Sequence, residues 1–110
     1  MEVKKRNEGG IDILTPEGRI DTSTAKAFEE GVMSTLNNSM KVIVQFNKLD
    51  YISSAGLRVM LIAQKKMNAK QGKLILSDLP PNIHEVFKMS GFDKILKICA
   101  NMDESKQLIN

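Results

Sequence analysis

The chain has 110 residues, of which 42% are apolar and 26% charged, a balance typical of one globular domain covering residues 1–110. Its 16 Lys and Arg residues and 13 Asp and Glu residues are spread along the chain, with no Trp and one Tyr, which argues against a nucleic-acid binder. A single cysteine, Cys99, excludes a disulfide framework, and a single distant histidine, His84, cannot complete a zinc site with it.

The N-terminal residues are polar, without the apolar stretch of a signal peptide. No later apolar run approaches the ~20 residues that span a bilayer. We therefore expect a cytoplasmic protein without a membrane segment.

The first half of the chain predicts a hairpin, a helix and a strand. Short strands are expected at residues 3–7 and 11–15, around the turn-forming pair Gly9-Gly10, with a second turn at residues 16–18. A helix is expected from Thr24, because apolar residues recur at helical spacing until residues 37–39 end it. These apolar residues are Ala25, Phe28, Val32 and Leu36. Residues 42–46 then read as a buried strand.

The second half continues the alternation. A helix is expected at residues 55–72, with Gly72 as its stop signal, then a strand at residues 74–76. A helix carrying Ile83, Val86 and Phe87 follows the Asp78 to Pro81 break and ends at Gly91, before a strand at residues 95–98 and a terminal helix at residues 102–109. We therefore expect a single α/β domain, a mixed but mostly parallel sheet of about four to five strands with about four helices.

Catalytic machinery is missing from the sequence. A hydrolytic nucleophile needs a nearby base, but His84 is the only histidine, and Ile52 stands where the nucleophile-elbow pattern of hydrolases requires glycine. No phosphate-binding glycine motif occurs. We therefore expect a binding protein and not an enzyme, with no cofactor of its own.

The stretch from Leu49 to Arg58 is the most informative part of the chain. It places Ser53 and Ser54 where a strand gives way to a helix, and a serine there is by default an N-cap worth about 1 kcal/mol. The same helix end, with its unpaired N–H groups and positive dipole, also tolerates a phosphate. A structural cap and a phosphorylation switch both remain open from the residues alone.

Two motifs make the whole chain resemble the STAS family, and within it the free-standing anti-sigma-factor antagonists of bacteria. The first runs from Gly18 to Ala25 and the second from Leu49 to Arg58. In that family the serine two residues before the glycine of D-S-[ST]-G-L is phosphorylated, and this position is Ser54 here. Ser53 stands where the family has Asp, Ala55 where it has Ser or Thr, and the family's other site acid falls on Asp21.

The resemblance implies a partner-binding surface and a set of partners. The surface comprises Asp21, Thr22, Thr24, Ser53, Ser54, Ala55, Gly56, Leu57 and Arg58. By resemblance, the unphosphorylated protein, monomeric when free, binds an anti-sigma factor with GHKL-type serine kinase activity and frees the sigma factor. That kinase brings its own ATP and magnesium and phosphorylates Ser54, which abolishes binding, and a PP2C-type phosphatase reverses the modification.

Two other interpretations remain. A STAS interaction module of a stress-signalling scaffold or a lipid-transporter complex would keep the fold without sigma-factor control, and Ser53 in place of Asp favours it. A small enzyme or nucleotide-binding protein is the weakest alternative, because the sequence lacks a general base, a set of metal ligands and a phosphate-binding loop.

Overall fold

The computed structural model describes residues 1–110 and is built around one long strand, β2 (Ile11–Ile20). β1 (Glu2–Glu8) pairs with it antiparallel, and Gly9 and Gly10 form the predicted hairpin turn with φ of 57° and 84°. The turn predicted at residues 16–18 is wrong, because β2 continues through it. Gly18, at φ 97°, instead bends the strand at a register shift in its pairing with the next partner.

β2 has two successive parallel neighbours on its other side. β3 (Lys41–Gln45) pairs with the stretch from Asp12 to Leu14, and β4 (Leu49–Ile52) pairs with the stretch from Gly18 to Ile20. No strand was expected at residues 49–52 from the sequence. Its middle residues Asp50 and Tyr51 are both exposed, so it lacks the alternation and the apolar run that mark strands.

The sheet continues from β3 to β5 (Lys73–Ser77) and ends at β6 (Ile98–Cys99), both parallel. The strand predicted at residues 95–98 therefore begins later than expected. A short 3₁₀ turn, η1 (Phe92–Lys94), extends to Leu96, whose N–H donates to the Phe92 carbonyl at 2.9 Å. The expected α/β class and mixed, mostly parallel sheet are confirmed, with six strands, slightly more than predicted.

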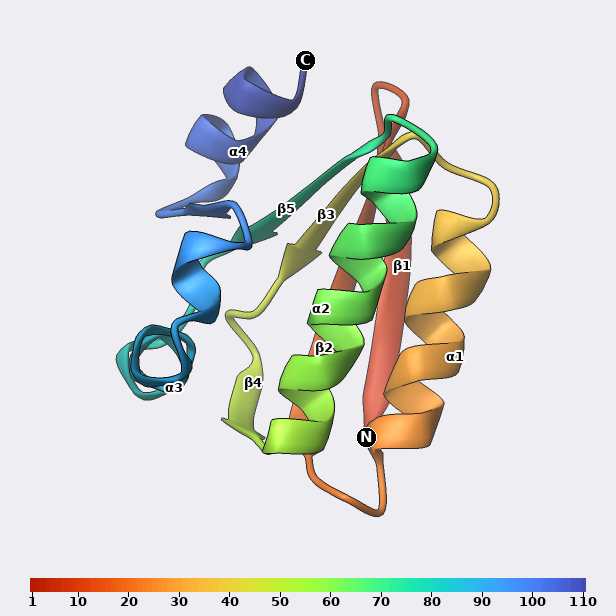
Figure 1. Ribbon diagram of the computed structural model, residues 1–110. Coiled ribbons are helices and arrows are strands. Elements are labelled where there is room, and N and C mark those ends of the chain that lie inside the picture. Colours follow the sequence, from red (N-terminus) through yellow and green to blue (C-terminus); the bar gives the residue numbers. More distant parts are fainter.

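Four helices cover the sheet: α1 (Ala25–Leu36), α2 (Ser54–Ala69), α3 (Pro81–Ser90) and α4 (Met102–Ile109). α1 and α2 lie side by side on one face (Figure 1), where the larger apolar core forms around Phe28, Phe46 and Met60. The alternate β residues Ile13, Ile43 and Ile75 point to the other face and form a smaller core with Ile109 of α4. No helix is long and apolar enough to cross a membrane.

The end of α2 differs from the sequence expectation. Gly72 was predicted as the left-handed stop residue, but the positive φ falls on Gln71, at 60°. Gly72 is needed for a different reason, since a Cβ there would lie 2.8 Å from Met67 Cε and 3.2 Å from the Met40 carbonyl oxygen. Gly91 does end α3 in the left-handed conformation, at φ 80°, as predicted.

Candidate functional site

β2 and β4 end together, and their ends place the two predicted motifs side by side. Ile20 pairs with Ile52 in the last register position of the two strands, so Asp21 and Ser53 follow at the same edge of the sheet. The Ser53 N–H donates to the Ile20 carbonyl at 2.8 Å. Figure 1 shows the loop after β2 and the start of α2 at this common end. Carboxyl ends of parallel strands are where α/β folds place functional loops.

Ser53 is the N-cap of α2. Its backbone is extended, its Oγ accepts from the Gly56 N–H at 3.4 Å, and its carbonyl accepts from the Leu57 N–H at 3.0 Å. The side chain is half-buried. Its hydroxyl is therefore engaged in starting the helix, which is the role expected of a serine at this position.

Ser54 is the first residue of α2 and lies in a different environment from its neighbour. It is exposed, and its Oγ forms no hydrogen bond within the chain. The unpaired N–H groups and positive dipole end of α2 surround this position. Of the two adjacent hydroxyls, the one at Ser54 is free for modification.

Gly56 and Leu57 are buried beneath this surface and position it. A Cβ on Gly56 would lie 2.6 Å from Ile20 Cγ2 and 2.7 Å from Ile52 Cγ1, so only glycine lets α2 start this close to the strand ends. Ala55 is half-buried, and Arg58 is exposed one helical turn after Ser54. Ser54 and Arg58 are therefore the α2 side chains of the predicted set that a partner can reach most directly.

Asp21 forms a reciprocal cap at the entrance to α1. Its Oδ1 accepts from the Ser23 hydroxyl at 2.6 Å and from the Ser23 and Thr24 N–H groups at 2.9 and 3.2 Å. Thr24 Oγ1 accepts from the Asp21 N–H at 2.9 Å and donates to the Arg19 carbonyl at 2.8 Å. These reciprocal bonds resemble a capping box, but they close the turn of residues 21–24, since the N-cap of α1, Thr24, has no side-chain cap hydrogen bond. Hydrogen bonds, chiefly from the Ser23 hydroxyl, lower the pKa of the Asp21 carboxyl. Thr22, from the same turn, is exposed.

A cation–π contact that was not expected from the sequence lies beside the site. The guanidinium carbon of Arg19 stands 4.4 Å from the centroid of the Tyr51 ring, a cation–π contact between paired residues of β2 and β4. Tyr51 is 40% exposed. Recognising β4 as a strand parallel to β2 would have brought these two residues together.

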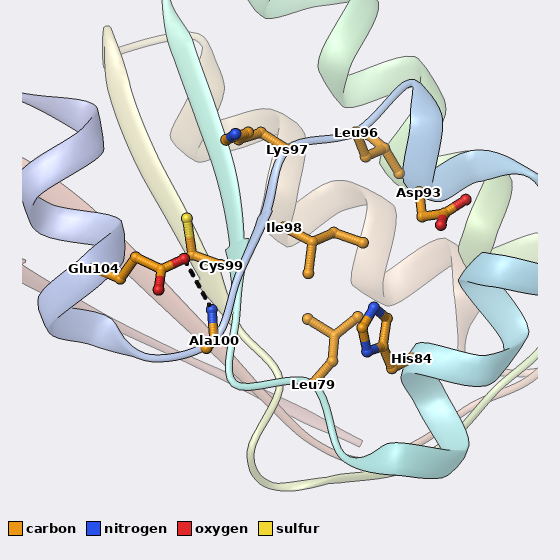
Figure 2. Close-up of a pocket in the computed structure, with 9 residues that line it drawn as sticks. All are labelled: Leu79, His84, Asp93, Leu96, Lys97, Ile98, Cys99, Ala100 and Glu104. Carbon is orange, nitrogen blue, oxygen red and sulfur yellow. Dashed lines mark hydrogen bonds between the residues drawn. The ribbon is translucent and has the colours of Figure 1, made fainter.

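The remaining chemistry-bearing residues lie elsewhere. His84 and Cys99 line a cavity of about 600 Å³ between α3, β6 and α4 (Figure 2), away from Ser54. Burial raises the pKa of the Cys99 thiol. No group of three or more His, Cys, Asp or Glu side chains is placed to hold a metal ion.

The STAS domain family model matches residues 2–105, and the chain belongs to this family. BtrV of Bordetella bronchiseptica, a candidate anti-sigma factor antagonist, is 36% identical over 97 residues, covering 87% of this chain and 83% of that protein. The crystal structure of a candidate anti-sigma factor antagonist from Thermotoga maritima superposes with a TM-score of 0.91 at 20% identity, covering 97% of this chain and 93% of that one.

Structures of the anti-sigma factor antagonist SpoIIAA show the same fold. Its unphosphorylated form has a TM-score of 0.72 at 15% identity, covering 96% of this chain and 94% of that one. The phosphorylated form of the Bacillus protein has a TM-score of 0.73 at 17% identity, covering 99% of this chain and all of that one.

Proposed function

We propose that this chain is an anti-sigma factor antagonist whose binding is switched by phosphorylation of Ser54. In the unphosphorylated form it binds an anti-sigma factor and releases the sigma factor, and a phosphate at Ser54 ends that interaction. The observation that most strongly supports this proposal is the free, exposed hydroxyl of Ser54 at the start of α2. The neighbouring Ser53 hydroxyl is already used as the helix cap. SpoIIAA, which has the same fold, exists in both unphosphorylated and phosphorylated forms.

The position of Ser54 explains how a phosphate could act without unfolding the domain. A phosphoserine adds a charge of about −1.5 to −2, and a helix N-terminus attracts negative charge. The fold therefore accommodates the modification. A partner docked over the same helix end instead meets an added charge that it must desolvate, and its affinity falls.

The proposed partners follow from this role. The anti-sigma factor is a GHKL-type serine kinase that supplies ATP and magnesium, so the chain needs no cofactor, and a PP2C-type phosphatase resets it. The protein acts in the cytoplasm as a monomeric binding module and not as an enzyme. Its docking surface combines exposed Ser54 and Arg58 of α2 with the Asp21 turn, which includes Thr22 and Thr24.

The first prediction concerns the acceptor. Incubation with the cognate anti-sigma factor kinase and Mg-ATP should add one phosphate at Ser54, because of the two adjacent serine hydroxyls only that of Ser54 is both exposed and unbonded. Tandem mass spectrometry of the peptide containing both serines locates the phosphate. Ser54→Ala should abolish most of the incorporation, whereas Ser53→Asp, which retains an N-capping oxygen and restores the family's residue, should preserve it. A phosphate found on Ser53 contradicts the assignment.

The second prediction separates a binding role of Asp21 from its capping role. Asp21→Ala and Ser23→Ala each remove the hydrogen bond between the Ser23 hydroxyl and the Asp21 carboxylate, so both should lower the melting temperature, Ser23→Ala through a loss of about 0.5–1.5 kcal/mol. Only Asp21→Ala removes the carboxylate, and it should also weaken kinase binding measured by titration calorimetry, whereas Ser23→Ala, which lies outside the predicted docking set, should leave that binding nearly unchanged. Equal affinities for the two variants would reduce Asp21 to a structural cap.

A STAS interaction module without sigma-factor control is the second candidate. It is favoured by the presence of Ser53 at the position where the family has Asp, because a kinase that recognises that carboxylate would not recognise this chain. This candidate predicts that Ser54 stays unmodified in the source cell and that Ser54→Asp leaves partner binding unchanged.

A further inference from the structure

Arg19 is an exposed cation that has no anionic partner within the chain. Its guanidinium forms no ion pair with any carboxylate and no hydrogen bond, and only its backbone carbonyl is used, by the Thr24 hydroxyl. Two carboxylates of the same segment are engaged elsewhere. Glu17 pairs with Lys4 at 3.1 Å, and Asp21 accepts the hydrogen bonds of its own turn. The positive charge of Arg19 is therefore uncompensated.

The ring of Tyr51 fixes the position of this charge. The guanidinium carbon of Arg19 stands 4.4 Å from the ring centroid, and the two residues are register partners on β2 and β4. The residues that follow them, Ile20 and Ile52, are buried in the larger core. Because side chains alternate along a strand, the stacked pair faces the opposite side of the sheet, where Tyr51 is 40% exposed. A guanidinium held on a ring face keeps the N–H groups at its edge available.

The stacked pair lies within reach of a partner docked at Ser54. Tyr51 precedes Ser54 by three residues, so their Cα atoms are at most about 11 Å apart. A standard protein interface covers about 800 Å² on each partner, a patch roughly 30 Å across. A partner that docks over the start of α2 and the Asp21 turn therefore extends to Arg19 and Tyr51. Arginine and tyrosine are also enriched among the residues that dominate binding energy.

The uncompensated charge of Arg19 restricts what the partner can place there. A docked partner removes water from the guanidinium, and a desolvated cation without an anion is unfavourable. The anions of protein side chains are the carboxylates of Asp and Glu. A planar guanidinium binds a carboxylate through two parallel N–H···O bonds, and the ring of Tyr51 already holds the Arg19 plane for this geometry.

We propose that Arg19, held by Tyr51, is a specificity-determining residue that pairs with an Asp or Glu side chain of the anti-sigma factor. This inference rests on the proposed function and gives the chemistry by which the chain distinguishes one anti-sigma factor from another. It also adds to the switch. A phosphate at Ser54 lies within about one Debye length, ~10 Å at 0.1 M salt, of the pair and repels the same carboxylate.

Titration calorimetry with the purified cognate anti-sigma factor kinase tests the pair. Arg19→Gln should lower the affinity about tenfold or more, because charge-assisted hydrogen bonds are lost. Arg19→Lys keeps the charge without the planar fork, and its affinity should fall between those of wild type and Arg19→Gln. Tyr51→Leu keeps an apolar side chain without the ring face and should also weaken binding. All three variants should keep the wild-type melting temperature, since both side chains are exposed.

Lys73→Gln is the matched control. It removes one positive charge from an exposed residue without an ion pair, at the start of β5 and therefore at the opposite end of the sheet. It should leave the affinity unchanged.

Charge reversal tests whether the partner group is a carboxylate. Arg19→Glu should abolish binding in a bacterial two-hybrid assay against the same kinase. In a set of kinase variants with each surface Asp or Glu changed singly to Lys, at least one should restore binding to Arg19→Glu. That variant should bind the wild-type chain more weakly than the unaltered kinase does.

Tyr51 provides a direct reporter of the contact. It is the only tyrosine of the chain, so labelling with ¹³C-tyrosine gives one set of ring signals in NMR, and these should shift when unlabelled kinase is added. Equal affinities for wild type and Arg19→Gln, unshifted ring signals at saturation, or the absence of a restoring Lys variant would each overturn this inference while the proposed function stands. A wild-type chain that binds no anti-sigma factor overturns both.

Discussion

Ser54→Asp, or phosphoserine at position 54, is expected to weaken binding of the proposed kinase anti-sigma factor roughly ten- to hundredfold while leaving the melting temperature nearly unchanged. The affinity falls because a docked partner must desolvate an unpaired charge, at a cost of about 1–3 kcal/mol. The fold is unaffected because Ser54 is exposed at the start of α2, where a negative charge gains about 0.3–1 kcal/mol from the helix end.

Titration calorimetry and thermal unfolding of the same samples measure the two effects. Ser54→Asn is the matched control, since its side chain has the shape of aspartate without the charge. It should retain more affinity than Ser54→Asp. If both substitutions weaken binding equally, the interface excludes a larger side chain and not a charge. A large fall in melting temperature for Ser54→Asp would show that Ser54 contributes to the stability of the fold.

Gly56→Ala should destabilise the protein by about 1–3 kcal/mol, the usual cost of forcing extra volume into a packed core. The new Cβ would lie 2.6 Å from Ile20 Cγ2 and 2.7 Å from Ile52 Cγ1, and both isoleucines are buried. Relief requires α2 to move away from the ends of β2 and β4, which also displaces Ser54. We therefore expect slower phosphorylation of the folded variant as well as a lower urea midpoint.

Gly31→Ala provides the comparison, because Gly31 is also a helical glycine. A Cβ there would meet Val3 Cβ at 3.6 Å, an ordinary contact. Replacing glycine by alanine in a helix without strain adds about 0.4–1 kcal/mol of stability. Opposite signs for the two substitutions are expected in urea unfolding. A gain in stability from both would show that the start of α2 has room for a side chain.

The helices and most of the parallel sheet could be predicted from the sequence because their apolar residues repeat at helical or buried-strand spacing. β4 could not, because Asp50 and Tyr51 are exposed and its identity as a strand comes from its pairing with β2. Likewise, Gln71 takes the left-handed conformation that a glycine rule assigns to Gly72. Long-range pairing and packing determine the backbone conformation at these positions, so local sequence patterns could not predict it.

The candidate site was predictable to the level of its segment. Two adjacent hydroxyls at a helix start are equivalent by residue type, and only the backbone geometry makes Ser53 the cap and leaves Ser54 free. The role of Ser23 in holding Asp21 was also missed, since a serine within a turn has no pattern that marks it as a donor to one carboxylate. The family resemblance predicts Ser54 as the acceptor, and its exposed, unbonded hydroxyl supports that prediction.

The short helix α4 makes the single thiol of the chain a reporter of local opening. Cys99 is buried in the smaller core with Met102 and Ile109 of α4, a helix of eight residues that is also joined to β1 by the ion pair of Lys106 with Glu8. Short terminal elements open with less free energy than the whole fold. The rate at which Cys99 reacts with an alkylating reagent therefore reports on local opening around α4 and the neighbouring cavity, without any engineered residue.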